Sequence, residues 1–177
     1  MITKSIKERI KEYYFLYPNE KLRVRGMEKK IRIPLPSAIR YAKELVKEGF
    51  LKTTEISGAV FYTANRSSPV FLLEKKLYNL KAIYESCLIG YLEERLGDPG
   101  IILFGSYAKG EDIETSDIDI YVETSIKTKV ELSIYEKRLS RKTQLFIHKN
   151  IREIKNKDLA NNIMNGIVLN GFIEVFK

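Results

Sequence analysis

The chain has 177 residues, so it can form one large domain or two small ones. Hydrophobic residues make up 44% and charged residues 31%, near the globular average, which excludes a disordered, collagen-like or disulfide-stapled chain. Apolar stretches such as residues 101–104 are far shorter than the roughly 18 residues of a membrane span. The first eight residues lack the apolar core of a signal peptide, and one cysteine cannot form an internal disulfide. We therefore expect a cytoplasmic protein with no membrane partner.

The positive charge is concentrated in the first part of the chain. Residues 1–75 contain 16 Lys and Arg against 8 Asp and Glu, whereas residues 76–177 contain 15 of each, so the net charge of +8 lies wholly in the first part. A basic segment joined to a neutral one indicates that the first contacts a polyanion and that the second has another task. A solvated basic surface without a partner is the alternative interpretation.

The first 65 residues have the pattern of three helices followed by a hairpin. Apolar residues spaced three and four apart predict helices over residues 3–17, 22–31 and 36–48. Two β-prone runs, residues 50–56 and 59–63, flank Ser57-Gly58, a dipeptide suited to a hairpin turn. Arg40, Lys43 and Lys47 lie on the polar face of the third helix.

This order of elements resembles a winged helix domain, and residues 36–51 (PSAIRYAKELVKEGFL) are similar to that family's recognition helix. The resemblance implies that the third helix enters the major groove of DNA. The contacts it implies are Ser37, Arg40, Tyr41 and Lys43 in the groove, and Lys47 and Lys52 at the phosphate backbone. Winged helices also serve as protein-interaction or dimerisation modules, and this role is the alternative to DNA binding. A homodimer is a further expectation.

A helical linker is predicted between two domains. Residues 66–96 carry apolar residues with a persistent three-four spacing, which predicts one long helix or two consecutive ones, ending at residues 97–100. Cys87 lies among the apolar positions and is expected to be buried. The predicted domains are residues 1–65 and 98–177, with residues 66–97 as the linker.

The second domain opens with a pattern suited to phosphate binding. Residues 101–104 form a short apolar strand that runs directly into Gly105-Ser106 and then into a predicted helix. A helix that begins there presents backbone N–H groups and the positive end of its dipole to an anion. Many strand-to-helix junctions contain Gly and Ser for geometry alone, so this turn by itself is weak evidence.

Two carboxylates follow on the next predicted strand, residues 116–122. Its alternation places Asp117 and Asp119 on one face, with Ile118, Ile120 and Val122 on the other. Carboxylates about 6 to 7 Å apart repel unless a hard cation lies between them, and Mg²⁺ prefers such ligands together with phosphates. The alternative is an exposed strand face that happens to hold two acids.

Together the two patterns resemble the DNA polymerase β-type nucleotidyltransferase superfamily, in particular the minimal nucleotidyltransferases. The motif residues are 104–110 (FGSYAKG) followed by 116–120 (SDIDI), and the resemblance covers about residues 98–177. A winged helix ahead of such a domain is similar to an archaeal group of predicted nucleotidyltransferases. The fold class implied is α/β (α+β), a winged helix domain followed by a mixed sheet flanked by helices. The tail of that group also implies a helix near residues 159–168 and a final strand over residues 172–176.

The resemblance implies a role for each motif residue. Gly105 and Ser106 would hold the triphosphate of a nucleotide, Asp117 and Asp119 would ligate Mg²⁺, and Lys109 could add charge near the phosphates. The activity implied is transfer of a nucleoside monophosphate, most plausibly AMP from ATP, to a hydroxyl acceptor with release of pyrophosphate. The resemblance also implies a hydroxyl on a partner protein as the acceptor, as in toxin–antitoxin pairs.

One position departs from the family pattern. Active members usually have a third acidic residue on a later strand, and the matching position here is Gln144 in residues 142–148. A neutral amide cannot take a proton from an acceptor hydroxyl, so whether the protein is an active enzyme stays open. Glu123 and Glu131 have no clear claim to that role, and His148 is a weaker candidate base. The alternative function is a transcriptional regulator or antitoxin-like protein with a weakened nucleotide-binding domain. A glycosyltransferase or phosphatase would not explain Gly105-Ser106.

Overall fold

The computed structural model describes residues 4–174 and separates into two compact units, Met1–Lys75 and Lys76–Lys177. The division falls inside the segment predicted as a linker. No helix within residues 4–174 is both long enough and apolar enough to cross a membrane. The boundary at residue 75 coincides with the change in charge, so the basic excess belongs to the first unit.

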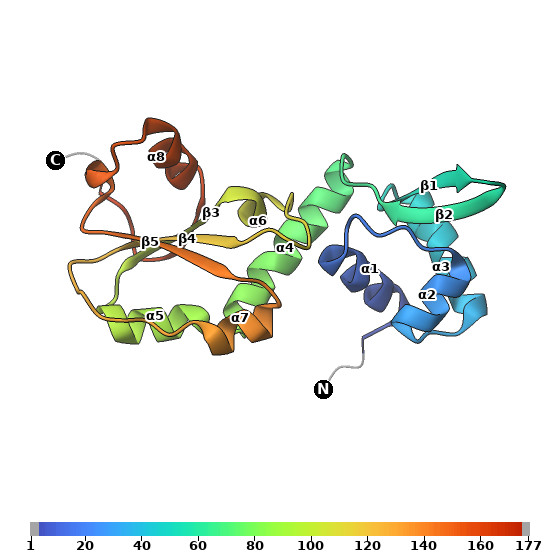
Figure 1. Ribbon diagram of the computed structural model, residues 1–177, viewed down its shortest axis with the longest axis horizontal. Coiled ribbons are helices and arrows are strands. Elements are labelled where there is room, and N and C mark those ends of the chain that lie inside the picture. The colour runs from blue at the N-terminus through green and yellow to red at the C-terminus, as the bar shows by residue number, and fades with distance from the viewer. Residues whose placement is uncertain (1–3, 175–177) are drawn as a thin grey trace. The chain divides into compact units, whose positions relative to one another are not determined.

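The first unit contains three helices and a hairpin, as predicted from the spacing of its apolar residues (Figure 1). The elements are α1 (Ile6–Leu16), α2 (Val24–Ile31), α3 (Leu35–Lys47), β1 (Leu51–Ile56), β2 (Ala59–Ala64) and the start of α4 (Pro69–Glu85). Strands β1 and β2 pair antiparallel with Ile56 opposite Ala59, so the turn lies at Ser57-Gly58.

Local sequence explains the helix ends in this unit. Ser5 caps α1 because its hydroxyl accepts a hydrogen bond from the Glu8 N–H (3.2 Å), and the Glu8 carboxylate accepts one from the Ser5 N–H (2.6 Å). Pro34 precedes the first residue of α3, where a missing N–H costs nothing. The core includes Phe15, whose ring lies 5.4 Å from Phe50 and 5.8 Å from Phe71 between centroids.

The second unit is a four-stranded mixed sheet with helices on both faces (Figure 1). Its elements after α4 are α5 (Leu88–Leu96), β3 (Gly100–Phe104), α6 (Gly105–Lys109), β4 (Ile118–Glu123), α7 (Ser133–Leu139), β5 (Thr143–His148), the 3₁₀ helix η1 (Ile151–Glu153), α8 (Lys157–Met164) and β6 (Ile167–Asn170). The strand order is β5-β4-β3-β6, in which β4 and β5 are parallel and β3 is antiparallel to both β4 and β6. The predicted mixed sheet is confirmed.

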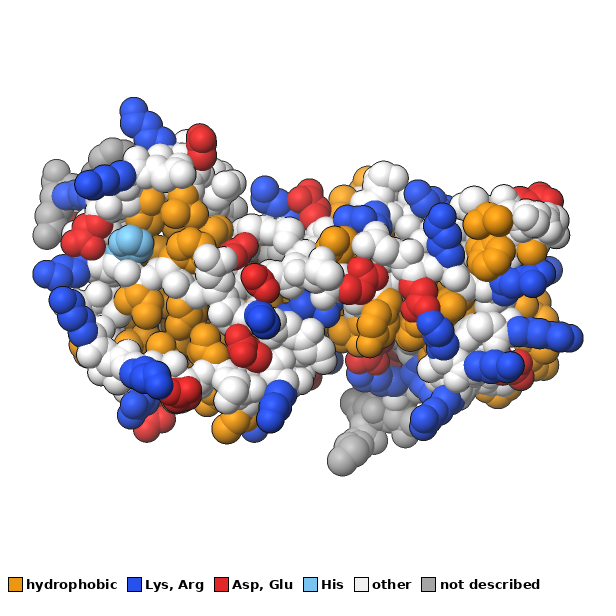
Figure 2. All heavy atoms as spheres, viewed as in Figure 1, with side chains coloured by type: hydrophobic (Ala, Val, Ile, Leu, Met, Phe, Trp, Pro, Cys, Tyr) orange, Lys and Arg blue, Asp and Glu red, His pale blue; other side chains and the backbone are white. Residues whose placement is uncertain are grey.

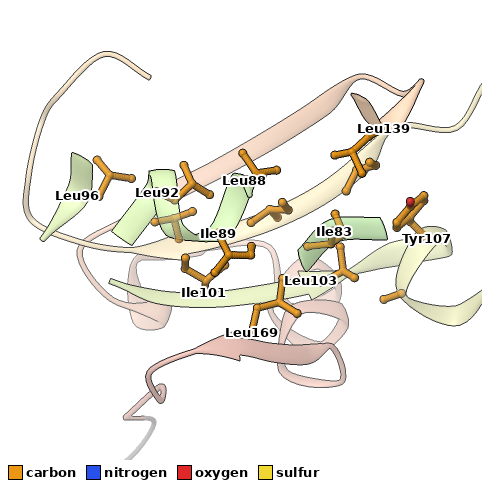
Figure 3. Packing of buried hydrophobic residues seen from close by; sticks show 14 residues of the cluster. Ile83, Leu88, Ile89, Leu92, Leu96, Ile101, Leu103, Tyr107, Leu139 and Leu169 are labelled. Atoms are coloured by element: carbon orange, nitrogen blue, oxygen red, sulfur yellow. The ribbon is translucent and has the colours of Figure 1, made fainter. Parts of the chain in front are cut away.

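Two apolar clusters cover the two faces of this sheet. On one face, residues of α4, α5 and α7 pack on the strands, with Leu92 and Leu139 above Ile101 and Leu103 (Figure 3). On the other face, Ile151 of η1 and Ile163 of α8 pack on Phe104 and Tyr121. Side chains alternate along β3 and β4, so apolar residues of these strands are buried on both faces of the sheet. Polar side chains that could bind a ligand are therefore expected at the ends of the strands.

Within residues 4–174 the last strand lies earlier than predicted. Strand β6 is Ile167–Asn170, paired with β3, whereas residues 172–174 form no strand and Phe172 is 79% exposed. Residues 175 and 176 of the predicted strand lie outside the described residues. The prediction was wrong because the pair Ile167-Val168 was assigned to a helix by its spacing from Ile163. Both residues are β-branched and pack well in a strand.

The prediction that Cys87 is buried was also wrong. The helical run is two helices, and Cys87 lies between α4 and α5 in a left-handed conformation (φ 64°). The thiol is exposed because the chain departs from the helical path there, so the three-four spacing does not carry through this residue.

Candidate active site

The turn after β3 brings backbone and carboxylate together. Gly105 has a φ of +74°, and a Cβ at this position would lie 2.4 Å from the Asp119 Oδ2 atom. Glycine is thus required both by conformation and by space. The contact joins the predicted phosphate-binding turn to the predicted carboxylate pair, although fourteen positions separate them in the sequence.

Helix α6 is short and firmly attached to its surroundings. Its residues Tyr107 and Ala108 are buried, and burial raises the pKa of the Tyr107 hydroxyl. The side-chain amide of Asn79, in α4, donates to the Tyr107 carbonyl (2.9 Å) and to the Asp112 carboxylate (2.7 Å). Ser106 is half-buried in the first turn of α6, next to Gly105. Lys109 is exposed in the last turn, at the opposite end from the one predicted to meet phosphates.

The negative charge of Asp117 acts on the carboxyl of Asp119. Strand β4 begins at Ile118, so Asp117 lies one residue before the strand and is exposed, whereas Asp119 is half-buried within it. Desolvation, and secondly the negative charge of Asp117, raise the pKa of the Asp119 carboxyl. Ionised together, the two carboxylates carry an unfavourable charge density that a bound cation would relieve.

Gln144 lies beside Asp119. In the register of the parallel strands β4 and β5, Asp119 is opposite Gln144, while on its other side Asp119 is opposite Phe104. Register partners on neighbouring strands face the same side of a sheet, so the Gln144 side chain shares the face of Asp119. Gln144 is exposed. The structure thus places Gln144 next to Asp119 on the same face of the sheet.

Glu123 and His148 lie away from the aspartates. Glu123, four residues further along β4 and so about 13 Å from Asp119, accepts hydrogen bonds from the Tyr121 hydroxyl and the Ile151 N–H, both at 2.9 Å. His148 is opposite Glu123 at that far end of the sheet, and its ring stacks on Tyr121 at 6.1 Å between centroids. Glu131 is exposed, and Lys129 beside it lowers the pKa of its carboxyl. The structure does not bring Glu123 or His148 to the site.

An open cavity of about 650 Å³ adjoins Asp117. Its walls are residues 114–117, helix α7 and residues 140–142, and they include Lys137 and Arg141. The Arg141 side chain is only 7% exposed, and its guanidinium lies 3.9 Å from the buried Asp112 carboxylate. Sequence reasoning missed this cavity because its walls are more than fifteen positions apart, and no motif marks α7.

The residues predicted to contact DNA lie on α3 and β1 of the first unit. Arg40, Lys43 and Lys47 are exposed at spacings of three and four, which places them on one side of α3, and Lys52 is exposed on β1. Figure 2 shows Lys and Arg side chains spread over this unit.

The remaining two predicted contacts, Ser37 and Tyr41, are half-buried. The Arg40 guanidinium lies 4.4 Å from the centre of the Tyr41 ring and donates to the Tyr41 hydroxyl (2.6 Å). The Tyr41 hydroxyl is therefore already engaged by Arg40.

A comparison with protein-family models finds a match over residues 86–170, to the family described as nucleotidyltransferase domain. The match covers just under half of the chain and lies within the second unit. It supports the nucleotidyltransferase superfamily for this unit, and with it nucleotidyl transfer to or from a nucleotide substrate. A search among curated proteins found no match to the chain. The first unit is untouched by these findings, so a winged helix domain stays a prediction.

Nucleotidyltransferase domains generally use divalent metal ions. Among residues 4–174, no group of three or more His, Cys, Asp and Glu side chains is arranged to hold one. Asp117 lies close enough to Asp119 to raise the pKa of its carboxyl, and Gln144 is the register partner of Asp119 on β5.

Proposed function

We propose that the second unit binds a nucleoside triphosphate together with Mg²⁺ and transfers a nucleoside monophosphate to a hydroxyl acceptor. The observation that carries this proposal is the contact between Gly105 and the Asp119 carboxylate, with Asp117 close enough to perturb it. A phosphate-binding turn and a pair of hard oxygen ligands are thus adjacent, as a nucleotide with its cation requires.

The chain's own residues divide the work. The backbone of Gly105 and Ser106, at the start of α6, would hold phosphate oxygens, and Asp117 and Asp119 would hold the cation. When bound, Mg²⁺ neutralises charge on the phosphates and stabilises the charge that develops during transfer. Desolvation, and secondly the negative charge of Asp117, raise the pKa of Asp119, and a bound cation would offset both by favouring the charged carboxylate. The tie from Asn79 to Tyr107 and Asp112 keeps α6 in place beside the pair.

We propose ATP as the donor, AMP as the transferred group and a protein hydroxyl as the acceptor, in a pair of the toxin–antitoxin kind. The test uses ATP labelled on the α-phosphate, with Mg²⁺ and candidate partner proteins, and follows both label transfer and pyrophosphate release. We expect Asp119→Asn to abolish transfer and Asp158→Asn, an equivalent change on exposed α8, to leave it intact. Transfer that persists in Asp119→Asn would refute the proposal.

We also propose that the first unit is a winged helix domain that binds DNA through α3. Arg40, Lys43 and Lys47 on one side of this helix, together with the location of the entire charge excess in this unit, support the proposal. A protein that binds DNA with such a domain commonly acts as a homodimer.

The second candidate function is a transcriptional regulator or antitoxin-like protein whose second unit binds a nucleotide without efficient transfer. Gln144 favours it, because the position beside Asp119 holds no base. Catalytic turnover, measured as pyrophosphate release, distinguishes the two candidate functions. Nucleotide binding without pyrophosphate release, with every candidate acceptor present, would favour the regulator.

A further inference from the structure

We infer that Gln144 limits the site to a single divalent cation, and that one substitution, Gln144→Asp, converts it to a site for two. This inference rests on the proposed function of the second unit. It concerns how many ions the carboxylate edge of the sheet can hold.

The first step is the position of Gln144. Neighbouring strands lie about 4.8 Å apart, and Gln144 is the register partner of Asp119 on the parallel strand β5. Its side chain is exposed and shares the face of the Asp119 side chain. A carboxylate at this position would therefore stand next to Asp119 and be open to ions from solvent.

The second step is charge. Two divalent cations held about 3.5 to 4 Å apart, as in two-metal sites, bring four positive charges into a small volume. Asp117 and Asp119 together contribute two negative charges. The Gln144 amide oxygen can serve as a ligand, but it adds no charge to offset the repulsion between the two ions.

The third step is the absence of a substitute among the described residues. Within residues 4–174 no third acid or histidine joins the pair. Glu123 lies about 13 Å along the strand and accepts hydrogen bonds from Tyr121 and the Ile151 backbone. The described part of the chain thus offers one charged pair and one neutral neighbour, a donor set suited to one ion.

The test counts bound Mn²⁺ by the electron paramagnetic resonance signal of the free ion. Mn²⁺ is titrated into the full chain, alone and with α,β-methylene-ATP, which cannot donate AMP. Ions bound in the nucleotide's absence are the ones counted for the protein, and the nucleotide arm shows how many are added. The readout needs no turnover.

The matched control is Asn150→Asp. Asn150 caps η1 by accepting a hydrogen bond from the Arg152 N–H (3.0 Å), and an aspartate can accept the same bond. This variant adds the same charge as Gln144→Asp, but beyond the far end of β5. Thermal unfolding of both variants checks that each is folded.

Without nucleotide we expect one bound Mn²⁺ per chain for the wild type and Asn150→Asp, and two for Gln144→Asp. With the nucleotide present, and after subtracting the ions that the same nucleotide binds without protein, Gln144→Asp should hold one ion more than the wild type. Equal stoichiometry in all three proteins, or two protein-bound ions in the wild type, would overturn the inference. If the ion counts follow the expectation but no acceptor yields transfer, the proposed activity fails while the inference stands. A wild type that binds no Mn²⁺ in either arm would overturn both.

Discussion

The two units carry their candidate functions in different physical forms. In the first, basic side chains stand exposed on α3, and each contributes a separate charge. In the second, a turn, two carboxylates and one amide are fixed by strand register and by a contact that leaves no space for a Cβ at residue 105. A surface of separate charges loses affinity gradually under substitution, whereas a site built on backbone geometry fails at a single position.

The sharpest test of this difference is Gly105→Ala. Alanine in the left-handed region costs about 1–2 kcal/mol, and its Cβ would also displace the Asp119 carboxylate. We expect lower stability and complete loss of the stabilisation that ATP with Mg²⁺ gives in thermal unfolding. The control is Gly58→Ala in the β1–β2 turn, where φ is +71° but no atom lies within 4 Å of the added Cβ. Nucleotide stabilisation that survives in Gly105→Ala would show that the backbone geometry is not essential.

In the first unit we expect a graded loss. Arg40→Ala should weaken DNA binding by about 1–3 kcal/mol if the side chain reads a base edge. Fluorescence anisotropy with labelled duplex at several salt concentrations measures both the affinity and its salt dependence, which should be steep. Lys155→Ala, an exposed position of the second unit, removes an equal charge and should leave affinity unchanged. Binding that ignores salt would contradict the electrostatic origin of the affinity.

The units can also be compared through their helix caps. Ser5→Ala removes the acceptor for the Glu8 N–H at α1, and Asn156→Ala removes the acceptor for the Asp158 and Leu159 N–H groups at α8. Each change should cost about 1 kcal/mol. Hydrogen exchange should locate the loss of protection in α1 for the first variant and in α8 for the second. Protection lost at both helices in either variant would show that the units do not respond separately.

The smallest expected effect is a gain in stability from Asp119→Asn. Because the pKa of Asp119 is raised in the folded protein, the folded state binds the proton more tightly than the unfolded state. Wild-type stability from this group therefore falls as pH rises from the ordinary Asp pKa to the raised one, and stays lower above it. Without metal, Asp119→Asn should be slightly more stable than wild type at neutral pH and lose this advantage in acid. Denaturant unfolding at both pH values measures it, and an advantage that grows in acid would contradict the assignment.

Most of the fold could be predicted from the spacing of apolar residues. The helices of the first unit, its hairpin and the strands β3 and β4 follow patterns that each lie within one short segment, whereas β5 was predicted only from the resemblance to the nucleotidyltransferase superfamily. The predictions of secondary structure and burial were wrong where the spacing of apolar residues is compatible with two different structures. Ile167 and Val168 fit a helical spacing and a strand equally well, and pairing with β3 decides between them. Cys87 was predicted to be buried because the apolar residues on either side of it keep a three-four spacing in the sequence. That spacing does not reveal the break between the two helices.

The candidate site could be predicted in part for a similar reason. Asp117 and Asp119 follow from the alternation along one strand, and Gly105 follows from a strand that runs into a turn. Their combination into one site, and the choice of Gln144, came from the resemblance to the nucleotidyltransferase superfamily. The cavity beside Asp117 could not be predicted, because α7 meets residues 114–117 only through the folded sheet. Nor could the position of Glu123 be judged in advance, since its hydrogen bonds depend on η1.

The break between α4 and α5 has a practical consequence. Cys87 is the chain's single cysteine, and its thiol is exposed, so a maleimide dye would label the native protein at one position without mutagenesis. The neighbouring Ser86 carbonyl accepts a hydrogen bond from Arg138 of α7 (2.8 Å), the helix that forms one wall of the cavity beside Asp117. A fluorophore on Cys87 would thus report movement of that wall when a nucleotide is added.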